Sequence, residues 1–162
     1  MSRRSLQISL LVAVFVPAAT LAYAQLPNPY GASIDITNAK KVAASAVAEA
    51  KKNNLFMAVA VVDTAGNLVY FEKMDGTQIG SVNVAQDKAR SAALFKRPTK
   101  AFQDVVASGG VGLRILALEG AVPVDGGVPL ISEGKIVGAV GLSGGTSDQD
   151  GMCAQAGAGA LK

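Results

Sequence analysis

Lys88 is the residue whose surroundings in this sequence most suggest chemistry. At about 100° per residue on a helical wheel, apolar residues fall on both sides of it: Val84, Ala85, Ala92 and Phe95. A cation inside an apolar arc needs a partner or a purpose, because burying an unpaired charge is costly. We therefore predict that Lys88 meets an anionic group of a ligand, such as a carboxylate. Two structural alternatives remain open: the amine reaches water at the end of its stem, or it pairs with a carboxylate across a subunit interface.

Two glycine-rich loops flank a predicted hairpin in the last third of the chain. Gly126 and Gly127 precede its first strand, and Ser143 and Gly144 begin a run of small residues after its second strand. Successive backbone amides in such a run can form a nest for an anion in front of a following helix. Alternatively, the first loop only permits the turn into the strand, and the second is a helix cap preceded by a turn. We predict that both loops contribute to a ligand site with Lys88.

A third loop, Met74-Asp75-Gly76, is predicted to line the mouth of the same site. The alternative for Met74 is structural, because methionine is more often a filler of cores. Asp75, Asp148 and Asp150 could bind a hard cation, but the ordered ligand spacing of a calcium loop is missing. No metal site is predicted.

Missing residue types exclude several classes of site. The sequence has no histidine, which excludes a histidine-based catalytic triad, a histidine-ligated zinc and a haem held by a proximal histidine. Its one cysteine, Cys153, cannot form an internal disulfide. It has no visible charge partner to lower its pKa, so we predict a packed thiol. Aromatic residues make up 5% of the chain and no dense basic patch occurs, so no nucleic-acid partner is predicted.

The first 24 residues are predicted to be an export signal. Arg3 and Arg4 precede an apolar stretch over residues 6–22, and the small-x-small pattern at 22–24 is typical of a cleavage site. The stretch is short for a membrane-spanning helix. We expect a periplasmic or secreted protein without membrane contact after cleavage. The arginine pair leaves both Sec and twin-arginine export open.

The remaining chain predicts one α+β domain at 37–162, after an irregular lead-in over residues 25–36. Amphipathic spacing predicts a first helix with Thr37 as its N-cap. A continuous apolar run at 55–62 predicts a strand buried on both faces. A turn organised by Asp63 joins it to a second strand at 68–74.

The second half of the domain repeats this alternation of helices and a hairpin. Helices capped by Ser81 and Thr99 are followed by a helical turn or an irregular segment at 111–118, a hairpin over 128–142, and a terminal helix capped by Ser147 or Asp148. The sequence therefore predicts an antiparallel sheet built from two hairpins, with helices packed on one or both faces.

Four sequence blocks, taken in order, resemble one family of small proteins. The blocks are residues 39–41, the stretch V-V-D-T-A-G-N-L at 61–68, the stretch D-K-A-R-S-A at 87–92, and the closing hairpin with its glycine loops at 126–145. As an ordered set they are similar to the GlcG/HbpS-like family of haem-binding or haem-degrading proteins, from about Ile34 to the C-terminus. The resemblance implies a profilin-like α+β fold and a homo-oligomer, often an octamer. It also implies that the ligand is haem or another tetrapyrrole, as in some extracytoplasmic members. Without histidine, haem ligation would need another residue, such as Met74 or Cys153, or would rest on apolar contact alone.

Three functional hypotheses follow. The first is an extracytoplasmic protein that binds a planar anionic small molecule, with haem or another tetrapyrrole as the leading candidate. The second is an enzyme of a small-molecule catabolic pathway, with Lys88 as base or electrostatic anchor and backbone amides near Ser143 stabilising a developing anion. The third is a structural oligomer without a ligand.

Overall fold

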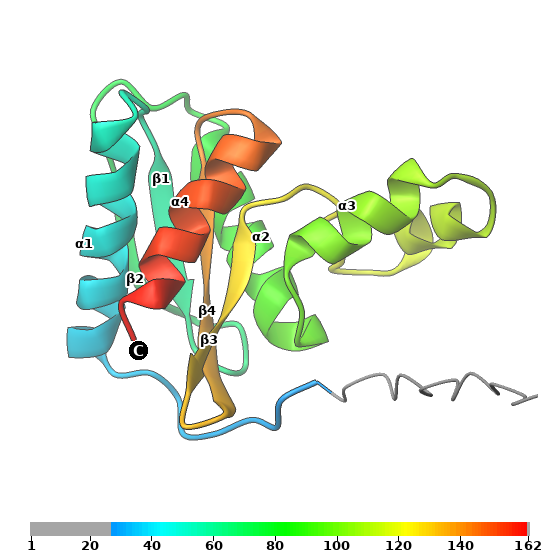
Figure 1. Cartoon of the computed structure of the whole chain (residues 1–162), viewed down its shortest axis with the longest axis horizontal. Helices are drawn as coiled ribbons and strands as arrows, with labels where there is room; N and C mark the ends of the chain where they lie inside the picture. Colours follow the sequence, from blue (N-terminus) through cyan, green and yellow to red (C-terminus); the bar gives the residue numbers. More distant parts are fainter. Residues whose placement is uncertain (1–26, 162) are drawn as a thin grey trace, which may run out of the picture.

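Four antiparallel strands form a single sheet in the order β2-β1-β4-β3, with helices on both faces (Figure 1). The computed structural model describes residues 27–161, so the predicted signal at 1–24 lies outside the described residues. In chain order the elements are α1 (Ile36–Lys52), β1 (Ala58–Val62), β2 (Leu68–Lys73), α2 (Ser81–Phe95), α3 (Thr99–Ala107), the 3-10 helix η1 (Gly110–Ala117), β3 (Gly127–Ser132), β4 (Lys135–Ser143) and α4 (Ser147–Gly159). The predicted α+β fold is confirmed, and the two hairpins meet through their inner strands, β1 and β4.

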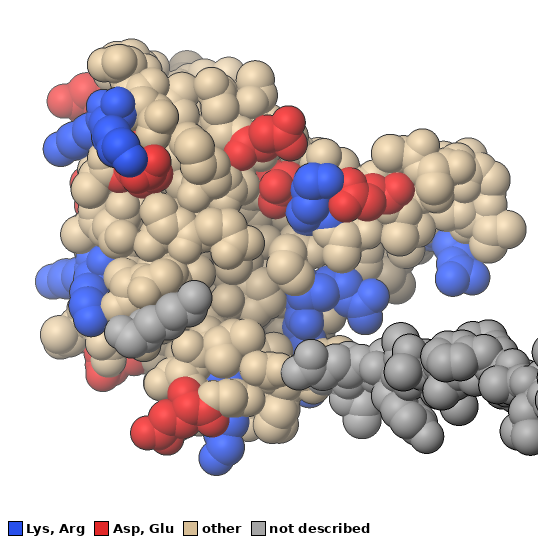
Figure 2. All heavy atoms as spheres, in the orientation of Figure 1, with Lys and Arg blue, Asp and Glu red and all other residues tan. Residues whose placement is uncertain are grey.

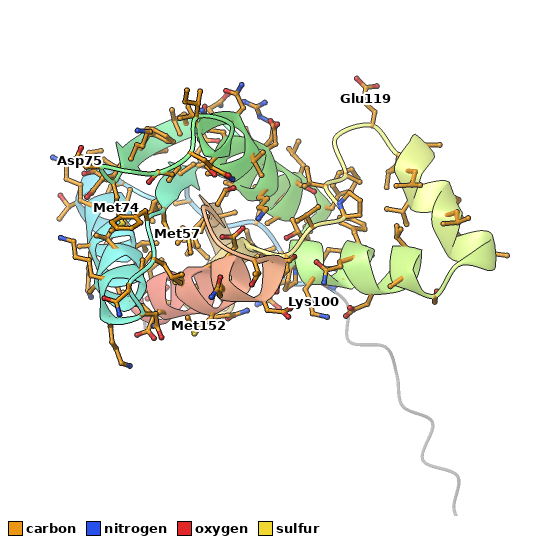
Figure 3. The ribbon with its side chains drawn as sticks, turned by 90° about the horizontal axis from the view of Figure 1, so that it is seen from above. Met57, Met74, Asp75, Lys100, Glu119 and Met152 are labelled. Carbon is orange, nitrogen blue, oxygen red and sulfur yellow. The ribbon has the colours of Figure 1, made fainter. Side chains whose placement is uncertain are left out.

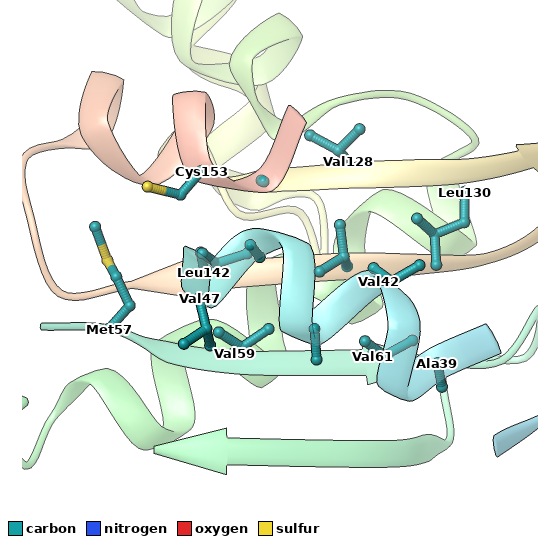
Figure 4. Packing of buried hydrophobic residues seen from close by; sticks show 14 of the residues in the cluster. Ala39, Val42, Val47, Met57, Val59, Val61, Val128, Leu130, Leu142 and Cys153 are labelled. Carbon is teal, nitrogen blue, oxygen red and sulfur yellow. The ribbon is translucent and has the colours of Figure 1, made fainter. Parts of the chain in front are cut away.

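The alternation of valine and alanine along β1 sorts the helices onto the two faces of the sheet. Val59 and Val61 point into the core beneath α1 and α4, as Figure 4 shows. Ala58 and Ala60 point to the other face, where they meet the alanines of α2. Successive side chains of a strand face opposite sides, so one five-residue run serves both layers. All five residues of β1 are buried, which confirms the prediction of a strand covered on both faces.

Small residues allow α2 to lie directly against β4. A Cβ added at Gly141 would lie 2.1 Å from the carbonyl oxygen of Ala85 and 2.9 Å from the Cβ of Ala89. Glycine inside a strand commonly marks such a close approach of another backbone. The glycine at this point of β4 is therefore explained by helix packing rather than by a ligand.

All four predicted helix caps are wrong by one or two residues. Ser81 and Thr99 are the first residues of α2 and α3, after Gly80 and Pro98 at the N-cap positions, and neither helix has a side-chain cap. The first helix is capped by Asp35 and not by Thr37, because the Asp35 carboxylate accepts the amide hydrogen of Asn38 at 2.7 Å. The last helix is capped by Thr146, whose hydroxyl forms a capping box with Gln149. Asp63 organises the first hairpin turn as predicted, because its carboxylate accepts backbone hydrogen bonds within the turn from Ala65 and from Asn67.

The segment from α3 to η1 forms an arm that projects from the body of the molecule (Figure 1). None of the eight residues of η1 is buried. Large apolar side chains are exposed along this arm: Val105, Val111, Leu113, Leu116 and Leu118. In Figure 2, charged side chains gather where α3 leaves the body, and most of the outer end is uncharged.

The described part of the lead-in, residues 27–35, is tied to the domain although it is irregular. Tyr30 pairs with Ile136 at the start of β4. Its hydroxyl donates a hydrogen bond of 2.8 Å to the carbonyl of Ala93 near the end of α2. Ile34 joins the hydrophobic core. Across residues 27–161, no helix has both the length and the apolarity needed to cross a bilayer.

Candidate functional site

Lys88 forms an ion pair with Asp150 inside the protein. Its Nζ lies 2.6 Å from Asp150 Oδ2, and the two side chains are only 1% and 4% exposed. Lys88 comes from α2 and Asp150 from the first turn of α4, so the pair joins helices on opposite faces of the sheet. The partner of Lys88 is therefore a carboxylate, as in the alternative of an ion pair. This carboxylate belongs to the same chain, however, and not to a neighbouring subunit. The alternative in which the amine reaches water does not fit this burial.

Backbone amides of the loop before α4 complete the shell around Asp150. The amide of Gly145 donates to Asp150 Oδ1 at 2.9 Å, and the amide of Gly144 also faces this carboxylate. Burial raises the pKa of Asp150, while Lys88 and the two amides act in the opposite direction. The loop is thus an anion nest as predicted from its sequence, but the anion it holds is a side chain of this protein.

Gly126 and Gly127, where β3 begins, pack against Lys88. A Cβ at Gly126 would lie 2.9 Å from Lys88 Nζ, and a Cβ at Gly127 would lie 2.3 Å from the carbonyl oxygen of Lys88. The amide of Gly127 donates to the hydroxyl of Thr99 at 2.9 Å. Both glycines therefore permit close packing over Lys88, and the structure brings Lys88, Gly126 and Gly127 together.

The Met74 loop lies elsewhere, next to the end of β4. Met74 Sδ accepts the amide hydrogen of Met57 at 3.4 Å, and Figure 3 shows these two methionines near each other. A Cβ at Gly144 would lie 3.0 Å from Met57 Sδ, so Met57 links this loop to the loop before α4. Ser143 is buried and shares a hydrogen bond of 3.0 Å with Ser81. Asp75 is exposed at the edge of the molecule.

A cavity of about 430 Å³ lies against the edge strand β3, away from these residues. It is bounded by the lead-in, the end of α2 and the last turn of α4. Its lining is mainly apolar, with three polar side chains: Pro27, Asn28, Lys96, Pro98, Val128, Pro129, Ile131, Ile136, Gln155, Ala158 and Gly159. None of the residues predicted for the ligand site lines it. Sequence reasoning missed this cavity because its walls come from four separate segments.

The described residues provide little for a metal ion. No group of three or more Cys, Asp or Glu side chains that could hold one occurs within residues 27–161. Cys153 is fully buried on α4, as predicted, and burial raises the pKa of its thiol to about 11, with the charges of Glu49 and Asp150 adding to the effect. Neither Cys153 nor Met74 lines the cavity.

Comparison with known proteins places this arrangement in a family. A family model described as haem degrading protein HbpS-like matches residues 34–159. The chain belongs to the HbpS-like family. Protein GlcG of Escherichia coli strain K12 is 37% identical over 105 residues, which cover 65% of this chain and 77% of GlcG.

Two solved structures of similar proteins share the fold over nearly their whole length. A double mutant of HbpS from Streptomyces reticuli has a TM-score of 0.74 and 28% identity, and the match covers 94% of this chain and 99% of that one. The complex of PduOC with heme has a TM-score of 0.72 and 27% identity, and the match covers 80% of this chain and 96% of that one. The family expected from the four sequence blocks is confirmed.

Proposed function

We propose that this protein binds haem or another planar, anionic tetrapyrrole outside the cytoplasm. The observation that carries this proposal is the similarity to PduOC, a domain solved in complex with heme, over 96% of that chain. The family description, which names haem as the molecule acted on, points to the same class of ligand.

The residues of this chain favour binding through apolar contact and carboxylates rather than through the iron. The chain has no histidine. Of the two substitutes considered, Cys153 is fully buried, and Met74 Sδ already accepts the amide hydrogen of Met57. Ligation of iron by either of these two side chains would require the protein to rearrange. We propose that a tetrapyrrole is held instead by its ring face and its propionates.

The enzyme hypothesis loses its main candidate. A general base must come within hydrogen-bond reach of its substrate. Lys88 is 1% exposed and Asp150 holds its amine. The amides near Ser143 are likewise turned toward Asp150. A structural role explains these groups better than catalysis does.

Location outside the cytoplasm is the part of this proposal that rests on residues 1–24. Expression of the full chain in a bacterial host, followed by cell fractionation and intact mass measurement, tests it. We expect the protein in the periplasm or the medium, with a mass that corresponds to a chain beginning at Gln25. A cytoplasmic protein that retains Met1 or Ser2 would overturn this part.

The exposed apolar arm supports self-association. The family resemblance likewise implies a homo-oligomer. A 3-10 run of eight residues is longer than usual, and this one has no buried residue to hold it. Contiguous exposed apolar side chains commonly mark interaction sites. We propose that the arm packs against further copies of this chain.

Titration with haemin, followed by absorbance spectroscopy, tests the ligand. The expected result is a shifted Soret band that saturates at a fixed ratio of haemin to protein. A featureless change that grows without saturation would contradict the proposed function. Bovine serum albumin from which fatty acids have been removed provides a positive control for the haemin stock.

A further inference from the structure

We propose that the cavity beside β3 binds an apolar ligand through its carboxylate-bearing end, and that Lys96 holds the carboxylate. This inference deepens the proposed function, because a haem propionate on its apolar ring is one such carboxylate-bearing end. Its application to a tetrapyrrole rests on that proposed function. It places the ligand in a cavity that none of the site residues predicted from the sequence lines.

The floor and sides of the cavity suit an apolar body. Val128 and Ile136 are 5% and 1% exposed and form its base, while Ile131 is partly open to it. Pro98 and Pro129 add rigid walls. Small-molecule sites are typically concave, mostly apolar and of about 300–1,000 Å³. The cavity of about 430 Å³ fits this description.

The lead-in is a fixed wall of this cavity. The amide of Ile136 donates to the carbonyl of Pro29, and the amide of Gly31 donates to the carbonyl of Ile136, both at 2.8 Å. The hydroxyl of Tyr30 is anchored on the carbonyl of Ala93. These three bonds hold Pro27 and Asn28 opposite β3, so the cavity exists before a ligand binds. A preformed site avoids the entropic cost of ordering a loop on binding.

Lys96 is the cation at this cavity. Its amine lies 4.2 Å from the centre of the Tyr30 ring, and among residues 27–161 no carboxylate lies within ion-pair distance of it. The side chain is half-buried, so part of its hydration is already lost. A carboxylate arriving from a ligand would supply the missing anion.

The backbone of Lys96 adds a second argument. It ends α2 with φ 55° and ψ 34°, a left-handed conformation that glycine or asparagine adopts more easily. Lysine here therefore costs some stability, and strained residues tend to cluster at ligand sites. The amides of Asn28 and Gln155 lie at the same cavity and can donate hydrogen bonds to a carboxylate.

Two variants test the site by different physical means. Gly159→Phe fills the cavity from α4, because a Cβ at Gly159 meets no atom within 4 Å. Its matched control is Gly80→Phe, since Gly80 also faces open space but lies at the start of α2. Lys96→Asn removes the charge and relieves the left-handed backbone. Its control, Lys51→Gln, removes an exposed charge from α1.

The measurement is haemin affinity, with thermal unfolding as a check on folding. Gly159→Phe is expected to weaken haemin binding about tenfold or more, by occupying the space. Lys96→Asn is expected to weaken it about tenfold, the loss of one charge-assisted hydrogen bond, without lowering the unfolding temperature. Both controls should bind as the natural protein does. If both cavity variants also bind haemin unchanged, the cavity assignment is wrong while the proposed function stands.

A second probe keeps the cavity testable if the natural protein fails to bind haemin and the proposed function falls. Titration with 2-naphthoate, a small aromatic carboxylate, is followed through the methyl NMR signals of Val128, Ile131 and Ile136. Saturable shifts of these methyls that are lost in Lys96→Asn would support the cavity. Methyl signals that do not move would overturn it. Parallel titration with 2-naphthyl methanol, which lacks the charge, separates carboxylate recognition from apolar contact.

Discussion

Lys88 Nζ and Asp150 Oδ2 lie 2.6 Å apart, and both side chains are almost wholly removed from solvent. The two residues come from helices on opposite faces of the sheet, as Figure 1 shows for α2 and α4. They meet at the point where β3 begins and β4 ends, with Gly126 packed over the contact. The pair therefore fastens the two helical layers to each other and to the loop before α4.

Loss of one partner of this pair should be strongly destabilising. Lys88→Met leaves the Asp150 carboxylate buried without its cation, and we expect the free energy of unfolding in urea to fall by about 3–5 kcal/mol. The double variant Lys88→Met/Asp150→Leu removes both charges and should recover a large part of that loss. A single variant within about 1 kcal/mol of the natural protein would mean that the pair does not stabilise the fold.

The double variant also separates structure from ligand binding. Because neither residue lines the cavity, its haemin affinity should match that of the natural protein. A loss of affinity in the folded double variant would instead return Lys88 to the ligand site, where its sequence context first placed it.

Cys153 should resist modification in the folded protein. Burial raises the pKa of its thiol to about 11, and the thiolate is the reactive form. Iodoacetamide at about pH 8 is expected to label it only after unfolding in urea. Rapid labelling of the native protein, detected by intact mass, would contradict its burial.

The raised pKa of Cys153 also affects the stability of the folded protein at alkaline pH. Between about pH 9 and 11 the thiol stays protonated in the folded state but ionises in the unfolded state. The folded state then binds more protons, so the Cys153 contribution to the free energy of unfolding falls as the pH rises through this window. The Cys153→Ala variant should lack this component. Identical pH slopes for the two proteins would argue against the shift.

Gly141 should tolerate no side chain. The Cβ of Gly141→Ala would lie 2.1 Å from the carbonyl oxygen of Ala85, so α2 must move away from β4. We expect a loss of about 1–3 kcal/mol in unfolding free energy, as for other overpacked cores. Gly159→Ala is the control, because its Cβ meets open space at the end of a helix. It should be neutral or stabilising. Equal unfolding midpoints for the two variants would show that α2 does not lie as close as described.

The apolar arm predicts a variant with an altered assembly state. Leu116 is 64% exposed on η1, so Leu116→Glu should leave the fold intact and reduce the mass measured by light scattering after size exclusion. Leu68→Glu, at an apolar residue exposed to 47% on β2, is the control and should keep the mass of the natural protein. An unchanged mass for Leu116→Glu would exclude this part of the arm from the contact between copies.

Local pattern was enough to predict the strands, the hairpin turns and most helix bounds. The valine–alanine alternation of β1, the Asp63 turn and the glycine-rich closing hairpin each carry their signal within a few neighbouring residues. Lys88 was recognisable as an unusual buried cation for the same reason. Its partner was not, because Asp150 lies 62 residues away and no local pattern connects them.

The cavity was beyond sequence reasoning for a further physical reason. Its cation, Lys96, is placed by a left-handed backbone at the end of α2, and its opposite wall is an irregular lead-in held by hydrogen bonds to β4 and α2. Neither the left-handed residue nor the irregular lead-in produces a periodic pattern in the sequence. The small residues of the loop before α4 correctly indicated an anion nest, but they could not show that Asp150 fills it.

Comparison of haemin with iron-free protoporphyrin IX tests the central claim most directly. If ring contact and carboxylates hold the ligand, the two dissociation constants measured by fluorescence quenching and absorbance should agree within about tenfold, or about 1.4 kcal/mol. Binding of haemin that is more than about a hundredfold tighter would show that the iron itself is ligated and would contradict this account.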